Sequence, residues 1–306
     1  MDYEININLN DSAKTLDGYE TIDYSNNSPD TLRYIWFHLW MNAYKNDRTA
    51  FSDQLLENGR TDFYFANENK KGYINQLNFK VNDIIAVAEY HPSHQDIIKV
   101  VLPTPLAPNN KTRITTPFHI QLPYNFSRGG YVENSFQITQ WYPKPAVYDK
   151  KGWHEMPYLD QGEFYSEFGD YKVKISLPKK YIVAATGELI ALDSSNFNKT
   201  LSFQQNNVHD FAWFASKDFL VEKDTIELNG KLINVYAYHY KRSQSFNTIQ
   251  YIKNAIITKS KWIGDYPYKT ISVIESLNNN SGGMEYPTIT YIDKAEDSKT
   301  HDLLIN

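Results

Sequence analysis

The stretch 281–287 is the strongest candidate for a functional site in this sequence. Gly282 and Gly283 come directly before Met284 and a single carboxylate, Glu285. Two adjacent glycines leave a main chain that another group can approach closely, because neither carries a Cβ. The stretch therefore indicates a close approach beside a carboxylate. The alternative is a glycine-rich turn that leaves Glu285 in solvent.

Two other groups of polar residues have spacings that occur in functional sites. His91 and His94 are three residues apart, but the proline between them and the polar flanks favour a solvated loop, and a metal needs three or four convergent ligands. Glu163, Glu167 and Asp170 form a carboxylate cluster that could include the carboxylate pair of a glycosidase. The aromatic residues between them favour the polar face of a hairpin instead. The sequence contains no Gly-x-Ser-x-Gly elbow, P-loop or dinucleotide fingerprint.

Most of the elements that must position these residues are predicted to be β-strands. Residues 3–9 alternate apolar and polar side chains, which is typical of a half-exposed antiparallel strand. Many short strands separated by turn residues indicate an all-β domain, which we expect to end near residue 216. The other predicted strands are 15–24, 32–40, 72–81, 97–102, 113–122, 171–177, 181–185, 200–203 and 211–214, with a further one starting at 131.

Helical patterns are rare before residue 216 and more frequent after it. A short helix is predicted at 52–58. Prolines at 103, 105 and 108 are expected to lie in a connection between two strands. Residues 245–263 have apolar side chains at spacings of three and four, which predicts a helix. Strands are expected at 225–228, 232–240, 270–275 and 288–292, and a second helix from 297. This alternation indicates an α+β domain at 217–306. Its apolar C-terminal run lacks a stop signal, so we interpret the chain as a fragment.

Composition excludes several classes of protein. The chain has 306 residues and a formal net charge of -5, which argues against a nucleic-acid partner, since that function favours a basic face. It has no cysteine, so no thiolate can bind metal or act as a nucleophile. No apolar run approaches the ~18–20 residues of a membrane span. No signal peptide is visible, and we expect that a leader has been removed.

Several motifs in one order resemble those of a known family. The stretch Gly-Gly-Met-Glu-Tyr-Pro resembles the Gly-x-Met-Glu-Asn motif of the aminopeptidase N and leukotriene hydrolase family, the gluzincin zinc metallopeptidases, especially its bacterial secreted branch. Further similar stretches are 140–149, 162–171 and 183–189. The resemblance runs from about residue 2 to 306. It implies a mainly β N-terminal domain, antiparallel and saddle- or sandwich-like, at 1–216, followed at 217–306 by the start of an α+β thermolysin-like catalytic domain.

The resemblance also assigns roles to the glycine-rich stretch. Glu285 would bind the N-terminal ammonium of a peptide substrate, which gives aminopeptidase behaviour. Gly282 and Gly283 would offer main-chain groups to the peptide as a strand-pairing edge, and Met284 would pack beneath. The family has Asn where this chain has Tyr286, which leaves the orientation of Glu285 open.

A second ammonium ligand is expected from the β domain. The family uses a Gln or Glu there, and Gln140 in Thr-Gln-Trp is the best match, with Gln137 the next. The alternative for Gln140 is a hydrogen bond at the end of a strand. Glu275, in the strand before the glycines, is expected at the surface or in the β-ladder.

The zinc ligands of the family are not found in this sequence. The family binds zinc through a His-Glu-x-x-His helix, in which the Glu is the general base. His154 and Glu155 match the first pair only, because Tyr158 stands at the second His position and Pro157 disfavours a helix. The resemblance therefore implies zinc ligands and a general base beyond Asn306, zinc as the cofactor of the parent protein, and no catalytic residue or metal within this chain.

The function implied is that of a zinc-dependent aminopeptidase that removes N-terminal residues from peptides, with this fragment inactive by itself. Its partner would be a peptide with a free N-terminus, and the branch implies export to a bacterial periplasm, cell surface or medium. One alternative is a non-catalytic β-sandwich that binds a peptide, a sugar or a protein. Another is a relative that has lost its zinc site and kept the groove. Substrate preference and oligomeric state stay open.

Overall fold

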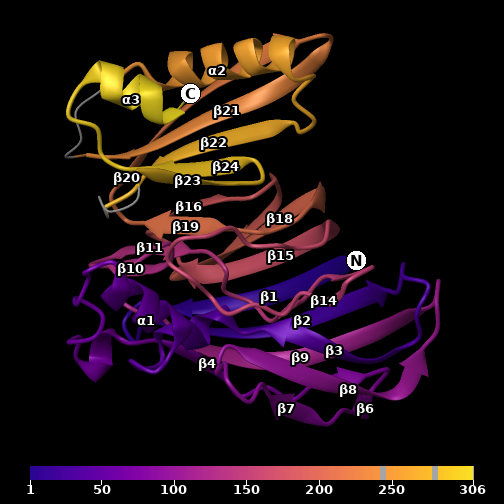
Figure 1. The fold of residues 1–306 in the computed structure, drawn as a ribbon. Helices are drawn as coiled ribbons and strands as arrows, with labels where there is room; N and C mark the ends of the chain where they lie inside the picture. The colour runs from indigo at the N-terminus through magenta and orange to yellow at the C-terminus, as the bar shows by residue number, and fades with distance from the viewer. Residues whose placement is uncertain (242–245, 278–281, 306) are drawn as a thin grey trace.

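A computed structural model describes residues 1–241, 246–277 and 282–305 of the chain and shows a mainly β fold (Figure 1). Ser281, the first residue of the glycine-rich stretch, and Asn306 lie outside the described residues. Strands up to residue 216 form a β-rich part, and the later strands form a separate sheet with two helices. The predicted mainly β class is confirmed.

The β-rich part is built on one large nine-stranded sheet. Its centre is a parallel pair, β1 beside β15, in which Ile5 lies opposite Val173. The other neighbours are antiparallel, and the apolar positions of β1 alternate as the sequence predicts. In spatial order the strands are β17 (Glu188–Ser194), β18 (Asn198–Val208), β15 (Gly169–Pro178), β1 (Asp2–Asn10), β2 (Thr15–Ser25), β9 (Lys111–Gln121), β5 (Lys80–Val81) and β6 (Ile84–Ile85), with β4 (Tyr73–Asn75) also on β9.

Smaller sheets cover the inner face of this large sheet and enclose the main core. The apolar side chains of β1, β2, β9 and β15 pack there against those of two four-stranded sheets. One sheet has the order β12 (Lys144–Pro145), β3 (Leu32–His38), β8 (Ile97–Leu106) and β7 (Ala88–Tyr90). The other has the order β10 (Gly130–Val132), β11 (Ser135–Ile138), β19 (Trp213–Ser216) and β16 (Ile182–Ala185), and a hairpin joins β13 (Tyr148–Asp149) and β14 (Gly152–Trp153).

Short helices fill one end of the β-rich part. α1 (Ala50–Glu57) begins after Thr49, whose hydroxyl accepts a hydrogen bond from the Ser52 amide, so the predicted helix starts two residues earlier than expected. The 3-10 turns are Trp40–Tyr44 and Glu68–Lys70. Buried aromatic rings from these segments pack together with Tyr158.

Three local predictions were wrong. Pro103 and Pro105 lie inside β8 rather than in a connection, and they are tolerated because β7 pairs with β8 only as far as Val100. The segment with Glu163 and Glu167 has no regular structure and is not a hairpin; Phe164 packs against the adjacent core, while Tyr165 and Phe168 are exposed. The strand β17 was missed because its side chains, which include apolar ones, are largely exposed.

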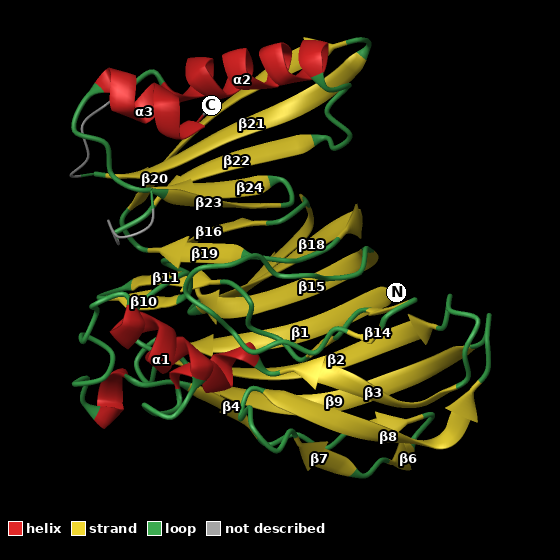
Figure 2. Ribbon diagram, in the orientation of Figure 1, coloured by secondary structure: helices red, strands yellow, loops and turns green. Residues whose placement is uncertain are grey.

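After residue 216 the chain forms a five-stranded mixed sheet (Figure 2). Its strands are, in spatial order, β20 (Phe219–Leu228), β21 (Lys231–Tyr240), β22 (Thr270–Glu275), β24 (Ile289–Ile292) and β23 (Gly283–Tyr286). Strands β21, β22 and β24 are parallel, while β20 and β23 are antiparallel to their neighbours. The two helices predicted in this region are α2 (Thr248–Trp262) and α3 (Ser298–Ile305), and both pack on one face of the sheet.

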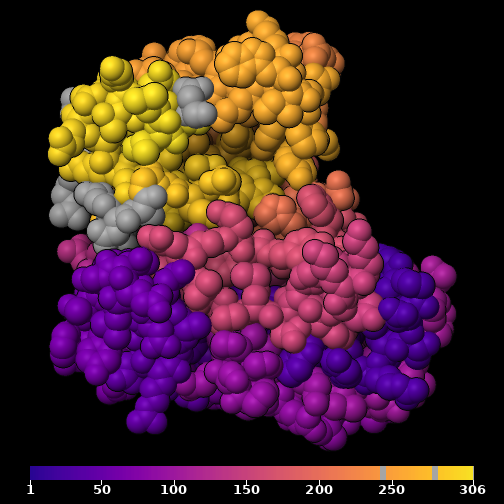
Figure 3. Space-filling model, viewed as in Figure 1, coloured from indigo at the N-terminus to yellow at the C-terminus, as the bar shows by residue number. Residues whose placement is uncertain are grey.

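The opposite face of this sheet rests on the β-rich part. Tyr286, Ile289 and Tyr291 pack there with Ala184 and Phe214. In the space-filling view the orange and yellow residues sit as a block on the pink and magenta ones (Figure 3). A hydrogen bond from the Gly187 amide to the Thr288 hydroxyl crosses the junction at 2.8 Å. The two parts are therefore joined by an apolar interface.

Candidate functional site

The glycine-rich stretch forms the end strand of the five-stranded sheet. Gly282 has a left-handed backbone with φ of 74°, which a glycine adopts without strain. A Cβ on Gly283 would lie 2.9 Å from the Tyr291 carbonyl oxygen, so this position also requires glycine. The Gly282 amide donates a 2.7 Å hydrogen bond to the Asp293 carboxylate, which fixes the start of β23. One side of β23 faces β24, and the other has no strand partner in the described part of the chain.

The side chains of β23 alternate between two environments. Met284 and Tyr286 point to the junction with the β-rich part and pack into its apolar cluster. Glu285 lies opposite Thr290 on β24 and is exposed, with no hydrogen-bond or ion-pair partner among the described residues. Thr290 in turn lines an apolar groove of about 420 Å³ beside α2. The carboxylate of Glu285 is thus available at the free edge of the sheet.

Tyr286, at the position where the family has Asn, is buried rather than exposed to ligand. Burial raises the pKa of its phenol well above the ordinary value, and the neighbouring Tyr291 adds to this effect. Its ring anchors β23 to the β-rich part. The residue therefore acts on Glu285 only through the position of the strand.

Gln140 lies in a buried polar network of the β-rich part. Its amide nitrogen donates to Asp210 at 2.7 Å, and its amide oxygen accepts from Lys144 at 3.3 Å. Lys144 and Asp210 form an ion pair of 2.7 Å with both side chains almost fully buried. Gln140 has a left-handed backbone, φ 51°, which this network stabilises. Both ends of its amide are thus engaged, and its contact with a substrate stays a prediction.

Gln137 connects the β-rich part to the five-stranded sheet. Its amide nitrogen donates to the Arg128 carbonyl at 2.6 Å, and its amide oxygen accepts from the Ser276 hydroxyl at 3.2 Å. Ser276 directly follows β22. Among the two candidate glutamines, Gln137 is the one with a described contact to this sheet.

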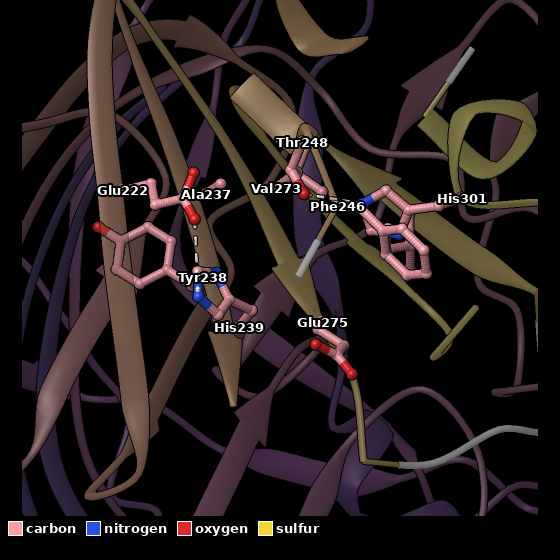
Figure 4. Close-up of a pocket in the computed structure, with 10 residues that line it drawn as sticks. Glu222, Ala237, Tyr238, His239, Phe246, Thr248, Val273, Glu275 and His301 are labelled. Atoms are coloured by element: carbon pink, nitrogen blue, oxygen red, sulfur yellow. Dashed lines mark hydrogen bonds and ion pairs between the residues drawn. The ribbon is translucent and has the colours of Figure 1, made fainter. Parts of the chain in front are cut away.

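A small polar pocket lies at the carboxyl ends of the parallel strands, the edge at which β23 also begins (Figure 4). Its polar lining includes Glu222, His239, Glu275 and His301. Its volume of about 20 Å³ holds a single water molecule at most, so it is not a substrate pocket. Of the two positions expected for Glu275, the structure shows the β-ladder, where it pairs with Ile292, and the residue is buried rather than at the surface.

The histidines of this pocket have structural partners. His301 lies 2.9 Å from the Thr248 hydroxyl and stacks on Phe246, and burial lowers its pKa. His239 lies 3.7 Å from the Glu222 carboxylate. The His301 contacts dock α3 against the start of α2, and the His239 contact joins β21 to β20.

The residues present do not form a zinc site. Within residues 1–241, 246–277 and 282–305, no three His, Cys, Asp or Glu side chains are grouped to hold a metal ion. His91 stacks on His94 and contacts the Trp36 ring at an angle, so this pair belongs to an aromatic cluster. His154 pairs with Asp149 at 2.8 Å. The same described residues contain no helix that is long and apolar enough to cross a membrane.

Sequence reasoning missed two buried cations. Lys144 lies between two prolines in a loop-like pattern, and nothing in that pattern predicts its burial with Asp210. Arg128 is buried at the junction, donates to the Gly162 carbonyl at 2.7 Å and lies over the Phe164 ring. The closely spaced prolines and aromatic residues around Lys144 were the only available signal of a packed corner.

Comparison with known proteins gives matches in structure only. No protein-family model matches the sequence, and no curated protein matches it. The crystal structure of an M1 zinc metallopeptidase from Deinococcus radiodurans is 13% identical, with a TM-score of 0.66 over 100% of this chain and 62% of that chain. A mutant M1 zinc metallopeptidase bound to a Tyr-Ser-Ala substrate is 14% identical, with a TM-score of 0.63 over 98% and 61%.

These structures confirm the expected fold. A two-domain M1 zinc metallopeptidase mutant bound to L-arginine gives the same result, with 13% identity and a TM-score of 0.65. The chain therefore has the fold of an M1 zinc metallopeptidase over its whole length, as the motif resemblance implied. It spans less than two thirds of the length of those proteins.

Proposed function

We propose that this chain is the N-terminal part of a zinc-dependent aminopeptidase-like metallopeptidase and that β23 receives the peptide substrate. The observation that carries the proposal is Glu285, an exposed carboxylate without a partner among the described residues, on the free edge of the sheet. The fold shared with M1 zinc metallopeptidases supports the same reading.

The edge of β23 suits an extended peptide. Main-chain groups at a free strand edge can pair with a peptide strand, and such pairing is a common mode of peptide recognition. Gly282 and Gly283 present no side chain at the start of this edge, so a peptide can come close. Glu285 would then accept hydrogen bonds from the N-terminal ammonium, and charge-assisted bonds of this kind are stronger than neutral ones.

Zinc would supply a polarised water molecule for hydrolysis. The described residues contain no group of three or more side chains that could hold a metal ion, and the role proposed for this chain is to bind and orient the peptide. Gln140 and Gln137 are proposed as further ligands of the ammonium through their amide oxygens, which here accept hydrogen bonds from Lys144 and from Ser276 respectively. We further propose export to a bacterial periplasm or surface, by resemblance to the secreted branch.

Peptide binding to the chain itself tests the role of Glu285. A tripeptide with a free N-terminus should bind Glu285→Gln about tenfold more weakly than wild type, because a charged pair becomes neutral. The N-acetylated tripeptide should bind both proteins equally. Isothermal titration measures both affinities, with Glu227→Gln on exposed β20 as the matched control. Equal weakening for both peptides would contradict the ammonium role.

Activity of the complete gene product tests the enzyme. We expect bound zinc and hydrolysis of aminoacyl anilides, with Glu285→Gln raising KM for free-amine substrates more than for N-blocked ones. A complete product that has neither zinc nor hydrolysis but still binds peptides would favour the binding-module alternative.

A further inference from the structure

A pocket of about 360 Å³ lies in the β-rich part, apart from the five-stranded sheet. It forms where the end of β2, the loop after it, the β13–β14 hairpin and the segment before β15 meet. None of its lining residues comes from β20–β24, α2 or α3. Its size is at the lower end of the range of small-molecule sites, about 300–1,000 Å³.

Three carboxylates line this pocket, and each has an oxygen that is not engaged by the described residues. Asp30 accepts the Tyr148 hydroxyl with Oδ2 at 2.8 Å, which leaves Oδ1. Asp149 accepts the Lys151 amide and pairs with His154 through Oδ1, which leaves Oδ2. Glu167 has no hydrogen-bond or ion-pair partner among the described residues. The cations at the pocket are the exposed Lys150 and the amino group of Met1.

A buried tyrosine provides a second, independent indication of a ligand. Tyr24 lines the pocket, is only 6% exposed, and its hydroxyl has no hydrogen-bond partner among the described residues. Burial raises the pKa of this phenol well above its ordinary value, and the charge of Glu167 adds to the effect, so the hydroxyl lies near that carboxylate. The ring is buried, while the hydroxyl is accessible from the pocket and is free to bond a group placed there. A ligand with donors and acceptors would satisfy it.

Aromatic rings line part of the pocket, and contacts with neighbouring residues fix Tyr148 and the loop after β2. Tyr148 packs edge-on against Trp153 at 5.0 Å and is fixed by its bond to Asp30. The loop after β2 is held by the Asn26 amide, which donates to the carbonyls of Asp30 at 2.8 Å and Leu106 at 3.0 Å. Phe168 adds an exposed ring. Aromatic faces beside carboxylates attract organic cations.

We propose that this pocket binds a small organic cation, an ammonium or guanidinium group on a short aliphatic chain, between Glu167, Asp30 and Asp149. The three carboxylates attract the positive charge, and the tyrosine and phenylalanine rings pack on the aliphatic chain. A metal ion is not the expected ligand, because these carboxylates are not grouped closely enough to coordinate one. This site is independent of the proposed peptidase function.

The test uses agmatine, which carries both a guanidinium and an ammonium group. Isothermal titration is carried out at low salt on the 306-residue chain in a Glu285→Gln background, which removes any contribution from the peptide edge. We expect saturable binding that weakens at least tenfold in Glu167→Gln and severalfold in Tyr24→Phe, which loses only the hydroxyl. Glu227→Gln on exposed β20 should leave the affinity unchanged.

Three results would overturn the proposal. The first is no agmatine binding up to about 10 mM. The second is binding that Glu167→Gln does not weaken, with unchanged far-UV circular dichroism showing that the variant is folded. The third is binding of a neutral polyol such as methyl glucoside in preference to agmatine, which would identify a sugar site.

Discussion

At the scale of single residues, the candidate edge depends on two glycines and a buried tyrosine. Gly283 allows β23 to lie against the Tyr291 carbonyl, and Gly282 adopts the left-handed turn before it. Tyr286 then ties the strand to the β-rich part. The position of Glu285 therefore follows from its neighbours and not from contacts of its own side chain.

The alanine variants of the two glycines should differ in stability. Gly283→Ala places a methyl group against a main-chain oxygen and should reduce the free energy of unfolding by about 1–3 kcal/mol. Gly282→Ala meets no atom within 4 Å and should cost about 1 kcal/mol through its backbone alone. Urea unfolding measures both. If Gly283→Ala loses less stability than Gly282→Ala, the close contact between position 283 and the Tyr291 carbonyl is contradicted.

Glu20 is a carboxylate that lies fully buried in the core of the β-rich part. It lies on β2, and neither carboxylate oxygen has a hydrogen-bond partner among the described residues. Burial raises its pKa well above the ordinary 4.5, and the nearby Lys144 opposes the shift only in part. Since the folded pKa exceeds the unfolded one, the stability it contributes is complete below pH 4.5 and is lost as the pH rises through the folded pKa.

Glu20→Gln should therefore stabilise the protein only at higher pH. Relative to its value at pH 4, the difference from wild type should grow by about 1 kcal/mol or more at pH 7, because the amide cannot ionise. Unfolding free energies at the two pH values measure this change, and steric effects of the substitution cancel in the comparison. A difference that is the same at both pH values would show that Glu20 has an ordinary pKa.

At the scale of elements, the buried network around Asp210 joins segments that are distant in sequence. Asp210 precedes β19 and accepts from Lys144 of β12, from Gln140 and from the Tyr142 hydroxyl at 3.0 Å. The Tyr142 hydroxyl also contacts that of Tyr171 on β15 at 2.9 Å. The network thus fixes the corner at 140–145 against the large sheet.

Removal of the buried cation should be strongly destabilising. Lys144→Met leaves the Asp210 charge without its counterion and should cost about 3–5 kcal/mol. The double variant with Asp210→Asn should be less destabilised than the sum of the two single variants. Lys217→Met, at a partly exposed ion pair with Asp11, should cost under about 1 kcal/mol and serves as the control. Additive losses in thermal or urea unfolding would argue against a coupled pair.

At the scale of the whole molecule, the apolar junction joins the two parts, and we expect them to unfold as one cooperative unit. Tyr291 is 1% exposed and packs near Phe214 of β19, with ring centroids 5.9 Å apart. Trp262 is the only one of the six tryptophans that lies after residue 216, and it is largely exposed. Tryptophan fluorescence therefore reports mainly on the β-rich part.

Loss of packing at the junction should lower the stability of the β-rich part as well. Tyr291→Ala should reduce the free energy of unfolding by about 3–5 kcal/mol and lower the fluorescence midpoint, although no tryptophan is altered. Tyr291→Phe, which keeps the ring, should lose about 1 kcal/mol or less. An unchanged fluorescence midpoint in Tyr291→Ala would show that the two parts unfold independently.

The sequence by itself determined the class of fold and most of its elements. Strict alternation in 3–9 specifies which side chains of β1 are buried, because the side chains of a strand alternate between its two faces. The apolar spacing of 245–263 likewise predicts α2. The ordered motifs, from Gln140 to the double glycine, pointed to the fold that the M1 structures share. These signals are local, so they are readable without a structure.

Only the tertiary structure decided the environment of the candidate site. It places Gln140 in a buried network, buries Glu275 and Tyr286, and leaves Glu285 exposed at a free edge. The proline-containing β8 and the carboxylate-lined pocket also arise from contacts between segments far apart in sequence. The burial and charge partners of a side chain depend on which distant segments pack beside it, and local residue patterns do not contain that information.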